Sequence, residues 1–323
     1  MRILVTGGSG FIGTNLIQEL LERKHEVVNL DVSAPRSKAH VPYWRAVSLL
    51  DEHGTSQVLK EVRPDYVIHA AARTDLDGRT SDEYAVNTTG TSNLVTAMAA
   101  VGSVRRAIFF SSMLVCRNGY SPSDDVDYCP DTAYGESKVE MERIIRERIG
   151  LARTEFVIVR PTSVWGPWFS GPYLQFFLMI RRGTYVHPGR KKVKKQFAYV
   201  GNVVAQMLNL LDASSEDCAG AVFYVGDYSE YIVREWADSI QRELGARRIR
   251  TVPLSVLKVI AAVGDVLNSL GWRRVPLTSF RLTNMLTNNS LPYEKSVRVF
   301  GPLDYSVTDG VRRTIAWLDK QAL

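Results

Sequence analysis

The first thirteen residues, MRILVTGGSGFIG, constrain the fold of this chain more than any other stretch. An apolar run at residues 3–5 leads into glycines at positions 7, 8, 10 and 13, which predicts a buried parallel strand, a sharp turn and the start of a helix. Gly7 permits the turn, Gly10 presents no Cβ toward a diphosphate, and Gly13 lets the helix pack closely on the strand. Because helix N-termini bind anions, the stretch predicts a dinucleotide site. The residues assigned to this site are Gly7, Gly10, Phe11, Ile12 and Gly13.

An acidic residue stands where such a site needs one. A second strand, expected at residues 26–30, ends at Asp31, about 20 residues beyond the turn. A carboxylate there accepts hydrogen bonds from the adenosine ribose and repels the extra phosphate of NADP. The sequence therefore predicts NAD as the cofactor, although Arg36 and Lys38 in the following loop keep NADP open.

The composition excludes several other classes of protein. The 323 residues are 45% apolar and 23% charged, as in a globular protein of one large domain or two associated ones. The net charge of +6 is modest, and the dense basic cluster at residues 190–195 is interpreted as an anion-binding loop rather than a nucleic-acid patch. No nucleic-acid partner is expected.

Cysteine content and apolar runs bear on the compartment. The three cysteines, at positions 116, 129 and 218, have neither metal-ligand spacing nor the pattern of a disulfide framework, which predicts no metal and a reducing cytoplasm. The N-terminus is expected to be a core strand and not a removable signal peptide. No apolar run reaches the roughly 20 residues that span a bilayer, so no membrane partner is expected.

Strands and helices alternate through the first half of the chain. After residue 31, strands are expected near 46–49, 66–70, 107–111 and 155–160, and helices at 55–62, 83–100 and 134–148. Alternation at this spacing produces parallel strands joined by right-handed crossovers. The predicted fold class is α/β, a Rossmann-like doubly wound parallel sheet.

The second half is less regular. Residues 164–173 are rich in glycine, proline and aromatic residues and are expected to form a loop, whereas 197–211 and 221–225 are expected to return to the main sheet. Helices are expected at 232–244, 254–270 and 307–320. We therefore predict a NAD(P)-binding domain at 1–165, joined by 197–225. Residues 166–196 and 226–323 form a smaller, partly discontinuous C-terminal lobe that binds substrate and closes over the cofactor.

Three residues are candidates for the chemistry. Ser112 follows a predicted strand, Tyr134 stands at the start of a helix, and Lys138 lies one turn further along that helix. A lysine cation beside a phenol favours the phenolate, so Tyr134 can act as a general base toward a sugar or alcohol hydroxyl. The Ser112 hydroxyl can hold the same oxygen. Ser112, Tyr134 and Lys138 are therefore predicted to be catalytic, with Tyr134 and Lys138 also contacting the cofactor and Ser112 and Tyr134 the substrate.

These features extend along nearly the whole chain. They are TGGSGFIG, Asp31, HAAA at 69–72, Asn87 in AVNTTGTSNL, SSMLVC at 111–116, YGESK at 134–138, Arg160-Pro161 before VWGP, FAYVGNVV at 197–204 and VTDGVRRTIAWL at 307–318. With them the chain resembles the extended short-chain dehydrogenase/reductase family, in the branch of nucleotide-sugar epimerases, dehydratases and reductases that includes UDP-glucose 4-epimerase-like enzymes.

The resemblance implies further site residues. Ser48 and Leu49 would lie against the adenine. Ala70, Ala71 and Thr74 would border the ribose and the nicotinamide, and Asn87 would hold the backbone near the cofactor. Arg281 would bind the nucleotide diphosphate of the substrate, because an arginine fork pairs with phosphate oxygens. Lys195-Gln196-Phe197 replaces the family's usual Arg-Asp-Phe, so diphosphate binding there passes to Arg190 or to the neighbouring lysines.

Departures from the family pattern narrow the reaction. Sugar 4,6-dehydratases carry an Asp-Glu pair where this chain has Met113 and Leu114, which can do no acid–base work. Two readings survive: an NAD-dependent epimerase acting at C4 of a nucleoside-diphosphate hexose through a 4-keto intermediate, and an NAD(P)H-dependent 4-keto-sugar reductase. A third reading ranks lower. Residues 252–267 and 273–280 resemble sterol-dehydrogenase-like relatives, whose late helices meet apolar substrates or membranes.

The family also commonly forms dimers through the helices that carry Asn87 and Tyr134. Apolar residues on these two helices supply candidate interface positions, although some of them must face the sheet. A homodimer is therefore predicted. The candidate positions are Leu94, Val95, Met98, Val139, Met141 and Ile145.

Overall fold

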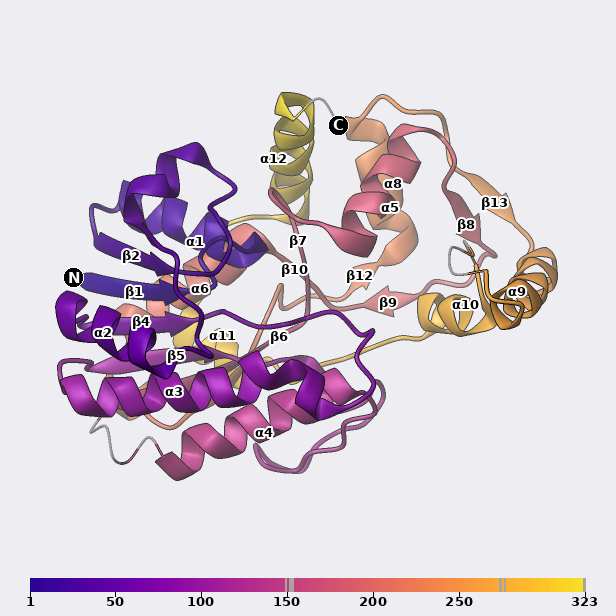
Figure 1. Cartoon of the computed structure of the whole chain (residues 1–323). Coiled ribbons are helices and arrows are strands. Elements are labelled where there is room, and N and C mark those ends of the chain that lie inside the picture. The colour runs from indigo at the N-terminus through magenta and orange to yellow at the C-terminus, as the bar shows by residue number, and fades with distance from the viewer. Residues whose placement is uncertain (149, 151–153, 273–274, 276, 322–323) are drawn as a thin grey trace. The chain divides into compact units, whose positions relative to one another are not determined.

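The structure, a computed structural model, describes residues 1–148, 150, 154–272, 275 and 277–321. Seven strands form its main sheet, and every pair of neighbouring strands is parallel (Figure 1). The predicted Rossmann-like doubly wound sheet is therefore confirmed. The strands across the sheet are, in order, β11 (Val222–Val225), β6 (Glu155–Pro161), β5 (Arg106–Phe110), β4 (Tyr66–His69), β1 (Arg2–Thr6), β2 (Glu26–Leu30) and β3 (Trp44–Arg45).

The direction in which strands are added reverses between β1 and β4. Strands β2 and β3 follow β1 on one side, whereas β4, β5, β6 and β11 lie on the other. A ligand crevice forms beyond the carboxyl ends of the strands at such a point. The chain that leaves β4 meets the end of β1 here, where the Ala70 nitrogen donates to the Thr6 oxygen at 3.0 Å. This edge of the sheet positions the site described below.

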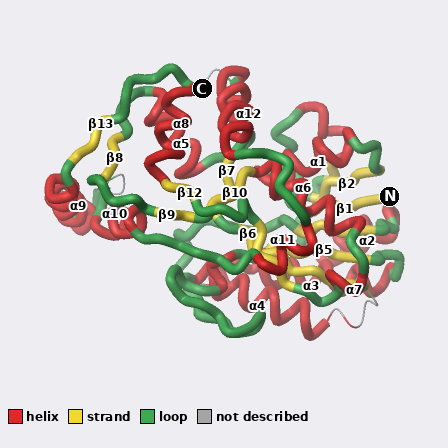
Figure 2. The backbone as a smooth tube through the Cα atoms, turned by 180° about the vertical axis from the view of Figure 1, so that it is seen from behind, coloured by secondary structure: helices red, strands yellow, loops and turns green. Residues whose placement is uncertain are grey.

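Continuous apolar runs allow the strands to be covered on both faces. Ile3, Leu4 and Val5 of β1 have no exposed surface, and every residue of β5 is buried. Helices of the same unit form two packed groups, and Figure 2 shows the strands between helices. One group is α1 (Phe11–Glu22), α6 (Val200–Asp212) and α11 (Glu294–Phe300). The other is α2 (Glu52–Val62), α3 (Ala85–Val101) and α4 (Ala133–Arg148).

The chain divides into two compact units. The first comprises Met1–Phe169, Ala198–Tyr228 and Leu291–Tyr305, and the second comprises Ser170–Phe197, Ser229–Ser290 and Ser306–Leu323. Residues 291–305 were expected in the smaller lobe. In the structure they pack on β11, where the Ser296 hydroxyl donates to the Tyr224 backbone oxygen at 2.6 Å.

The second unit is built around aromatic side chains. Trp236 of α8 (Val233–Glu243) is 4% exposed, and its ring lies 4.8 Å from that of Phe197 and 5.0 Å from that of Phe176. The elements of this unit are α5 (Gly171–Arg181), β8 (Val186–Pro188), β9 (Lys194–Lys195), β12 (Tyr231–Ile232), α8 (Val233–Glu243), β13 (Arg250–Val252), α9 (Leu254–Ser269), α10 (Ser279–Leu286) and α12 (Val307–Lys320).

Short elements complete the chain. They are η1 (Lys38–Tyr43), η2 (Ser81–Tyr84), η3 (Met113–Val115), β7 (Ser163–Trp165), β10 (Phe197–Tyr199) and α7 (Ser215–Cys218). Three local predictions are wrong. Strand β10, in the stretch expected to return to the main sheet, pairs with β7 in a separate two-stranded sheet. The strand expected at 46–49 lies at Trp44–Arg45, where the Trp44 indole donates to the Asp31 oxygen at 2.7 Å. The loop expected at 164–173 contains β7 and the start of α5, a helix in which Pro172 occupies the first turn, where proline is well tolerated.

The six apolar residues offered for a dimer interface all lie inside the chain. None of them is more than 4% exposed. Five belong to the core between the helices and the sheet, and Val139 packs with Val115 and Cys116 in a smaller cluster. Exposed positions on α3 and α4 are mainly polar, among them Thr96, Glu136, Glu140 and Arg143.

Candidate active site

In the turn between β1 and α1, two glycines have no room for a side chain and a third has space beside it. Gly7 has a φ of +72°, and a Cβ on it would lie 2.5 Å from the Ala71 nitrogen. A Cβ on Gly13 would overlap the Gly7 oxygen. Among the described atoms, a Cβ on Gly10 would meet only the Gly7 oxygen, at 3.1 Å. Packing therefore requires glycine at 7 and 13, whereas Gly10 leaves room for a ligand to approach the backbone.

The start of α1 has donors available to such a ligand. Gly10 is the N-cap and provides no side-chain hydrogen bond, and the helical bonding begins with the Thr14 nitrogen donating to the Gly10 oxygen at 2.9 Å. The N–H groups of the first turn, including those of Phe11 and Ile12, have no acceptor within the helix. These donors and the room at Gly10 fit the pyrophosphate of NAD, which they would hold at the positive end of the helix dipole.

Asp31 lies beside the same turn. Its Oδ2 accepts from the Ser9 nitrogen at 3.0 Å, and its Oδ1 accepts from the Ser33 nitrogen at 2.8 Å. Arg36 also borders Ser9, because its Nε donates to the Ser9 oxygen at 3.2 Å and its Nη1 to the Trp168 oxygen at 2.5 Å. Asp31, which is predicted to bind the adenosine ribose, therefore borders the same turn as Arg36, the residue that allows NADP as an alternative cofactor.

His69 ties three elements together behind the turn. Its Nδ1 lies 2.7 Å from Thr6 Oγ1, and its Nε2 lies 3.0 Å from Thr91 Oγ1. Because Thr91 donates its proton to the Asn87 oxygen, it accepts from Nε2–H, and Thr6 donates to Nδ1. The Thr6 hydroxyl accepts in turn from the Ala71 nitrogen at 3.3 Å. Burial lowers the pKa of His69 to about 3, so the ring is neutral and this order of donors is fixed.

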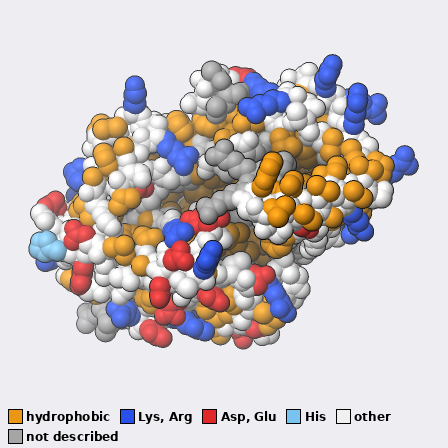
Figure 3. Space-filling model, turned by 45° about the vertical axis from the view of Figure 1, so that its right-hand side comes forward, with side chains coloured by type: hydrophobic (Ala, Val, Ile, Leu, Met, Phe, Trp, Pro, Cys, Tyr) orange, Lys and Arg blue, Asp and Glu red, His pale blue; other side chains and the backbone are white. Residues whose placement is uncertain are grey.

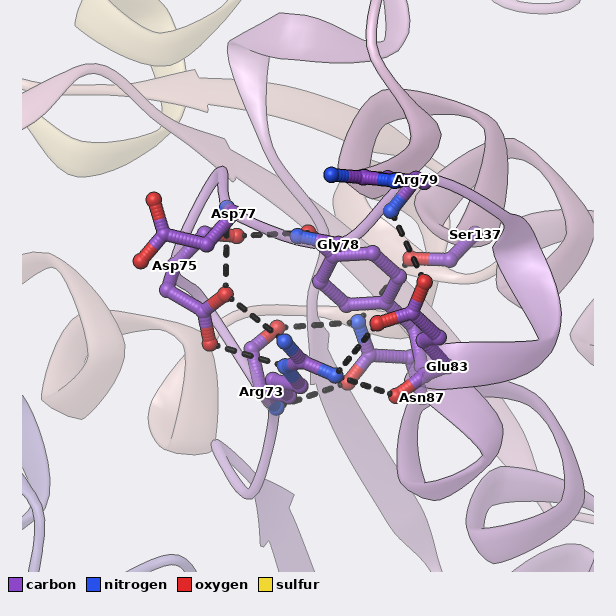
Figure 4. Close-up of polar contacts among 9 residues, drawn as sticks. Arg73, Asp75, Asp77, Gly78, Arg79, Glu83, Asn87 and Ser137 are labelled. Atoms are coloured by element: carbon purple, nitrogen blue, oxygen red, sulfur yellow. Dashed lines mark hydrogen bonds and ion pairs between the residues drawn. The ribbon is translucent and has the colours of Figure 1, made fainter. Parts of the chain in front are cut away.

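Asn87 of α3 holds the segment that follows β4 by its backbone (Figure 4). Its Oδ1 accepts from the Arg73 nitrogen at 2.9 Å, and its Nδ2 donates to the Arg73 oxygen at 3.1 Å and to Ser137 Oγ at 2.9 Å. The Ser137 hydroxyl donates to the Tyr134 backbone oxygen at 2.7 Å. One amide therefore links the loop after β4 to the first turn of α4.

The remaining residues assigned to the cofactor follow β3 and β4. Ala70 and Ala71 come directly after β4 and are partly buried, and Thr74 is exposed in the loop beyond. Ser48 lies in the turn after β3 and is partly buried, whereas Leu49 is 3% exposed. The side chain of Leu49 therefore belongs to the hydrophobic core.

The structure brings Ser112, Tyr134 and Lys138 together near the end of β5. The Ser112 hydroxyl accepts from the Leu114 nitrogen at 3.1 Å, and the Ser112 side chain acts on the Tyr134 phenol, whose pKa it lowers. Tyr134 is 8% exposed. Lys138 is 1% exposed, and its Nζ donates to the Phe110 oxygen at 2.8 Å. Two helical residues and one residue from a strand end therefore form one cluster, as the order of motifs in the sequence suggested.

Burial governs the ionisation of this cluster. It raises the pKa of Tyr134 to about 12, and the Ser112 side chain acts in the opposite direction. It lowers the pKa of Lys138 to about 7, against the attraction of the Glu142 carboxylate. The expectation that the lysine lowers the tyrosine pKa is therefore wrong. Desolvation penalises the phenolate and also leaves the lysine only partly charged near neutral pH.

A buried ion pair lies next to the cluster and was missed in the sequence. Arg160 Nε donates to Glu142 Oε1 at 2.9 Å and its Nη2 to Oε2 at 2.8 Å, and both side chains are at most 1% exposed. The Ser111 hydroxyl donates to Oε1 at 2.5 Å and the Tyr128 phenol to Oε2 at 2.9 Å. A charged residue in the apolar strand β6, and an acid one turn beyond Lys138 on α4, were the available signals.

A second missed feature is the stack on Tyr84. The Arg73 guanidinium lies 4.8 Å from the centre of the Tyr84 ring. It binds the Asp75 carboxylate through Nε at 2.8 Å and Nη2 at 3.0 Å (Figure 4). Tyr84 has no exposed surface, and its hydroxyl donates to the Asp75 backbone oxygen at 2.8 Å. No periodicity in the sequence announces this arrangement, because it depends on a loop that folds back on itself.

The two arginines assigned to the substrate diphosphate belong to the second unit and not to the cluster around Tyr134. Arg190 is exposed in the loop after β8. Arg281 is exposed in the first turn of α10, where its Nη1 donates to the Val275 oxygen at 2.6 Å.

Comparisons with known proteins agree on the family. Residues 3–226 match the model of the NAD dependent epimerase/dehydratase family. A 3 beta-hydroxysteroid dehydrogenase/Delta 5→4-isomerase of Mycobacterium tuberculosis is 29% identical over 273 residues, which cover 76% of this chain and 70% of that protein. An N-acetyl-alpha-D-glucosaminyl-diphospho-ditrans,octacis-undecaprenol 4-epimerase of Escherichia coli O157:H7 is 25% identical over 324 residues, 98% of this chain and 95% of that protein.

Among solved structures, a UDP-glucose 4-epimerase of Thermotoga maritima, determined with UDP-glucose, has the same fold. Its TM-score is 0.77 at 21% identity, with 100% of both chains covered.

Proposed function

This chain belongs to the NAD-dependent epimerase/dehydratase family, and on that premise we propose that it is a nucleotide-sugar 4-epimerase. It would oxidise C4 of a nucleoside-diphosphate hexose to a ketone and reduce that ketone on the opposite face. The observation that carries the proposal is the buried phenol of Tyr134, which lies with the buried side chains of Ser112 and Lys138 near the end of β5. Met113 and Leu114 support it, since they stand where a dehydratase needs an acid and a base.

Each residue of the site has a role in this reaction. When bound, NAD supplies the oxidation and reduction of the sugar carbon and a ring charge that favours phenolate over phenol. Gly10, Phe11 and Ile12 would hold its pyrophosphate, and Asp31 its adenosine ribose. Tyr134 takes the proton of the sugar hydroxyl and later returns it to the same oxygen. Ser112 holds that oxygen in place.

Lys138 and Asn87 set the position of Tyr134. The Lys138 side-chain nitrogen is fixed on the Phe110 backbone oxygen, and Asn87 reaches the Tyr134 backbone through Ser137. Neither residue needs to exchange a proton with the substrate.

Two other reactions use the same residues. A 4-keto-sugar reductase would bind NAD(P)H from solution and release a reduced sugar. A 3β-hydroxysteroid oxidoreductase is supported by the mycobacterial relative at 29% identity, and it would present a sterol hydroxyl to Tyr134. Each of the three reactions makes a different demand on added coenzyme and substrate.

The test is incubation of the purified protein with a panel of nucleotide hexoses without added coenzyme, followed by NMR. We expect at least one uridine- or other nucleoside-diphosphate hexose to equilibrate with its 4-epimer. Turnover of a 4-keto sugar only with added NADH or NADPH would favour the reductase. Oxidation of a 3β-hydroxysteroid with added NAD, and no epimerisation of any sugar, would favour the steroid reaction.

We also propose that the second unit carries the substrate nucleotide and that Arg190 and Arg281 bind its diphosphate. Replacing Arg281 by methionine should raise KM for the nucleotide sugar and leave NAD content unchanged. The homodimer likewise stays a proposal, and its interface would have to use the polar outer faces of α3 and α4. Light scattering at micromolar concentration tests it, and a monomer would refute it.

A further inference from the structure

Helix α9 has apolar residues on two sides. One set, Leu257, Ala261 and Gly264, is buried against the rest of the second unit. A second set recurs at the i, i+3, i+4, i+7 spacing of a helical stripe and is exposed. A helix with two apolar stripes needs two partners, and the described residues provide one. The exposed set is Val256, Val259, Ile260, Val263, Val266 and Leu270.

The packing of the first set fixes which way the second set faces. Leu257 and Ala261 pack with Leu282 of α10 in one hydrophobic cluster. A Cβ on Gly264 would overlap the Leu277 oxygen, so backbone and helix are in close contact there. Asp265 Oδ1 accepts from the Ser279 nitrogen at 3.0 Å, which sets the register between α9 and the start of α10. The helix cannot rotate its outer stripe inward without breaking these contacts.

The outer stripe is unusually exposed for apolar side chains. Val259 is 65% exposed and Leu270 is 71% exposed. Trp272 beyond the helix end, at 65%, and Phe280 of α10, at 75%, add two aromatic rings. Figure 3 shows hydrophobic side chains gathered over this part of the molecule, with lysine and arginine side chains around them. Soluble proteins rarely expose a contiguous apolar patch without a partner for it. We call the six residues of the stripe, with Trp272 and Phe280, the α9 face.

Positive charge is concentrated in the same segment. Residues 245–290 contain seven lysines and arginines and one acidic residue, a net charge of +6 that equals the net charge of the whole chain. Of the seven, Arg273 and Arg274 lie outside the described residues. The other five, Arg247, Arg248, Arg250, Lys258 and Arg281, are exposed. The one acid, Asp265, accepts the Ser279 hydrogen bond described above.

We propose that the α9 face docks on the surface of an anionic lipid bilayer. Its apolar side chains would enter the boundary between head groups and acyl chains, and the exposed cations other than Arg281, which is proposed for the substrate diphosphate, would bind lipid phosphates. Trp272 suits this boundary, where tryptophan is enriched. No helix among the described residues is both long and apolar enough to cross a membrane, so the chain would lie on the bilayer. The expectation of no membrane partner came from the absence of a span, and docking needs none.

Charge distinguishes this partner from the others that an apolar face admits. A symmetric contact with a second copy would bring the described cations of both copies, among them Lys258 of α9, toward each other, and like charges at an interface are unfavourable. A nucleic acid would meet a stripe of valine, isoleucine and leucine that offers no hydrogen-bond donors. An anionic bilayer accepts both the apolar stripe and the cations. The inference does not depend on the substrate of the enzyme.

The experiment is co-sedimentation of the whole protein with vesicles of phosphatidylcholine containing about 30 mol% phosphatidylglycerol. The wild type should bind these vesicles at least about tenfold more strongly than pure phosphatidylcholine, and binding should weaken as salt is raised. The triple variant Val259→Gln, Val263→Gln, Leu270→Gln should lose binding. The control Met179→Gln, on an equally apolar but 41% exposed position of α5, should keep it. All four positions are exposed, so thermal melts should show folded proteins.

A second readout places the face in the lipid. Lipids brominated on the acyl chain should quench tryptophan fluorescence of the wild type and leave the Trp272→Phe variant nearly unquenched. No binding by the wild type would overturn the proposal, and so would binding that the triple variant retains, which would indicate simple charge adsorption. A wild-type dimer in light scattering that the triple variant converts to a monomer would assign the face to self-association and overturn it as well.

Discussion

The ring of Tyr84 lies 6.0 Å from the ring of Tyr134 and is tilted by 55° against it. Two further contacts hold Tyr84 in place. Its hydroxyl donates to the Asp75 backbone oxygen at 2.8 Å, and the Arg73 guanidinium lies 4.8 Å from the centre of its ring. Asn87 fixes the backbone of Arg73 on both its N–H and its C=O. The loop after β4 and the phenol of Tyr134 are therefore parts of one packed arrangement, and a change in the loop should reach the phenol.

Replacing Tyr84 by leucine should lower kcat by about tenfold or more, because small displacements of a reacting group reduce rate steeply. KM should change little, since Tyr84 is fully buried. The Tyr84→Phe variant keeps the ring contact and loses only the hydroxyl, so its kcat should stay within about threefold of the wild type. Steady-state kinetics on both variants decides the matter. An unchanged kcat in Tyr84→Leu would show that the ring contact does not position Tyr134.

Replacing Tyr134 by phenylalanine should remove turnover and leave bound NAD in place. The phenylalanine ring preserves the contact with Tyr84 but cannot exchange a proton, and general acid–base groups contribute about 10²–10⁴-fold to rate. Activity is measured by NMR on the epimer mixture, and NAD content by absorbance after denaturation. Tyr120→Phe is the matched control, because that hydroxyl binds the Asp127 carboxylate at 2.7 Å. Near-full activity in Tyr134→Phe would remove the proposed base.

The sequence predicted the sheet, the glycine turn and the trio because each depends on local signals. Alternation of apolar strands with helices specifies parallel strands, and the i, i+4 spacing of Tyr134 and Lys138 places both on one side of a helix. The Glu142–Arg160 pair could not be predicted in the same way, because it joins a helix to a strand. The direction of the Tyr134 pKa was also missed, since burial of a phenol is a property of the packed structure and not of its neighbours in sequence.

The same contrast holds for the late part of the chain. Helix α9 was expected close to its true bounds, from its apolar content. Its division into an inner and an outer stripe depends on α10 and on the approach at Gly264, which no periodicity reveals. The homodimer residues show the converse, since apolar positions on α3 and α4 fit a core and an interface equally well until burial is known.

Replacing Arg160 by methionine should destabilise the protein by about 3–5 kcal/mol, because it leaves the Glu142 carboxylate buried without its cation. Urea unfolding measures this free energy. Adding Glu142→Gln in the same chain should recover part of the loss, since the buried charge is then gone. The control is Arg23→Met, which removes a pair with Glu19 in which the arginine is 47% exposed and should change stability by less than about 1 kcal/mol. Equal losses in Arg160→Met and Arg23→Met would contradict the importance of the buried pair.

Replacing Lys138 by methionine should abolish activity and change the pH dependence of stability. Burial lowers the pKa of Lys138 from 10.5 to about 7 in the folded protein, so between these values the unfolded chain binds a proton that the folded chain does not. Stability of the wild type therefore falls as pH decreases from about 10 to about 7 and is level below, as far as this group is concerned.

Methionine at position 138 has no such titration, although it loses the hydrogen bond to the Phe110 backbone oxygen. The free energy of unfolding is measured in urea for both proteins at about pH 10 and about pH 6. The difference between variant and wild type should shift in favour of the variant by at least about 1 kcal/mol from the higher to the lower pH. The exposed Lys60→Met control should show no gain, and a pH-independent difference for Lys138→Met would mean that the buried lysine keeps its charge without penalty.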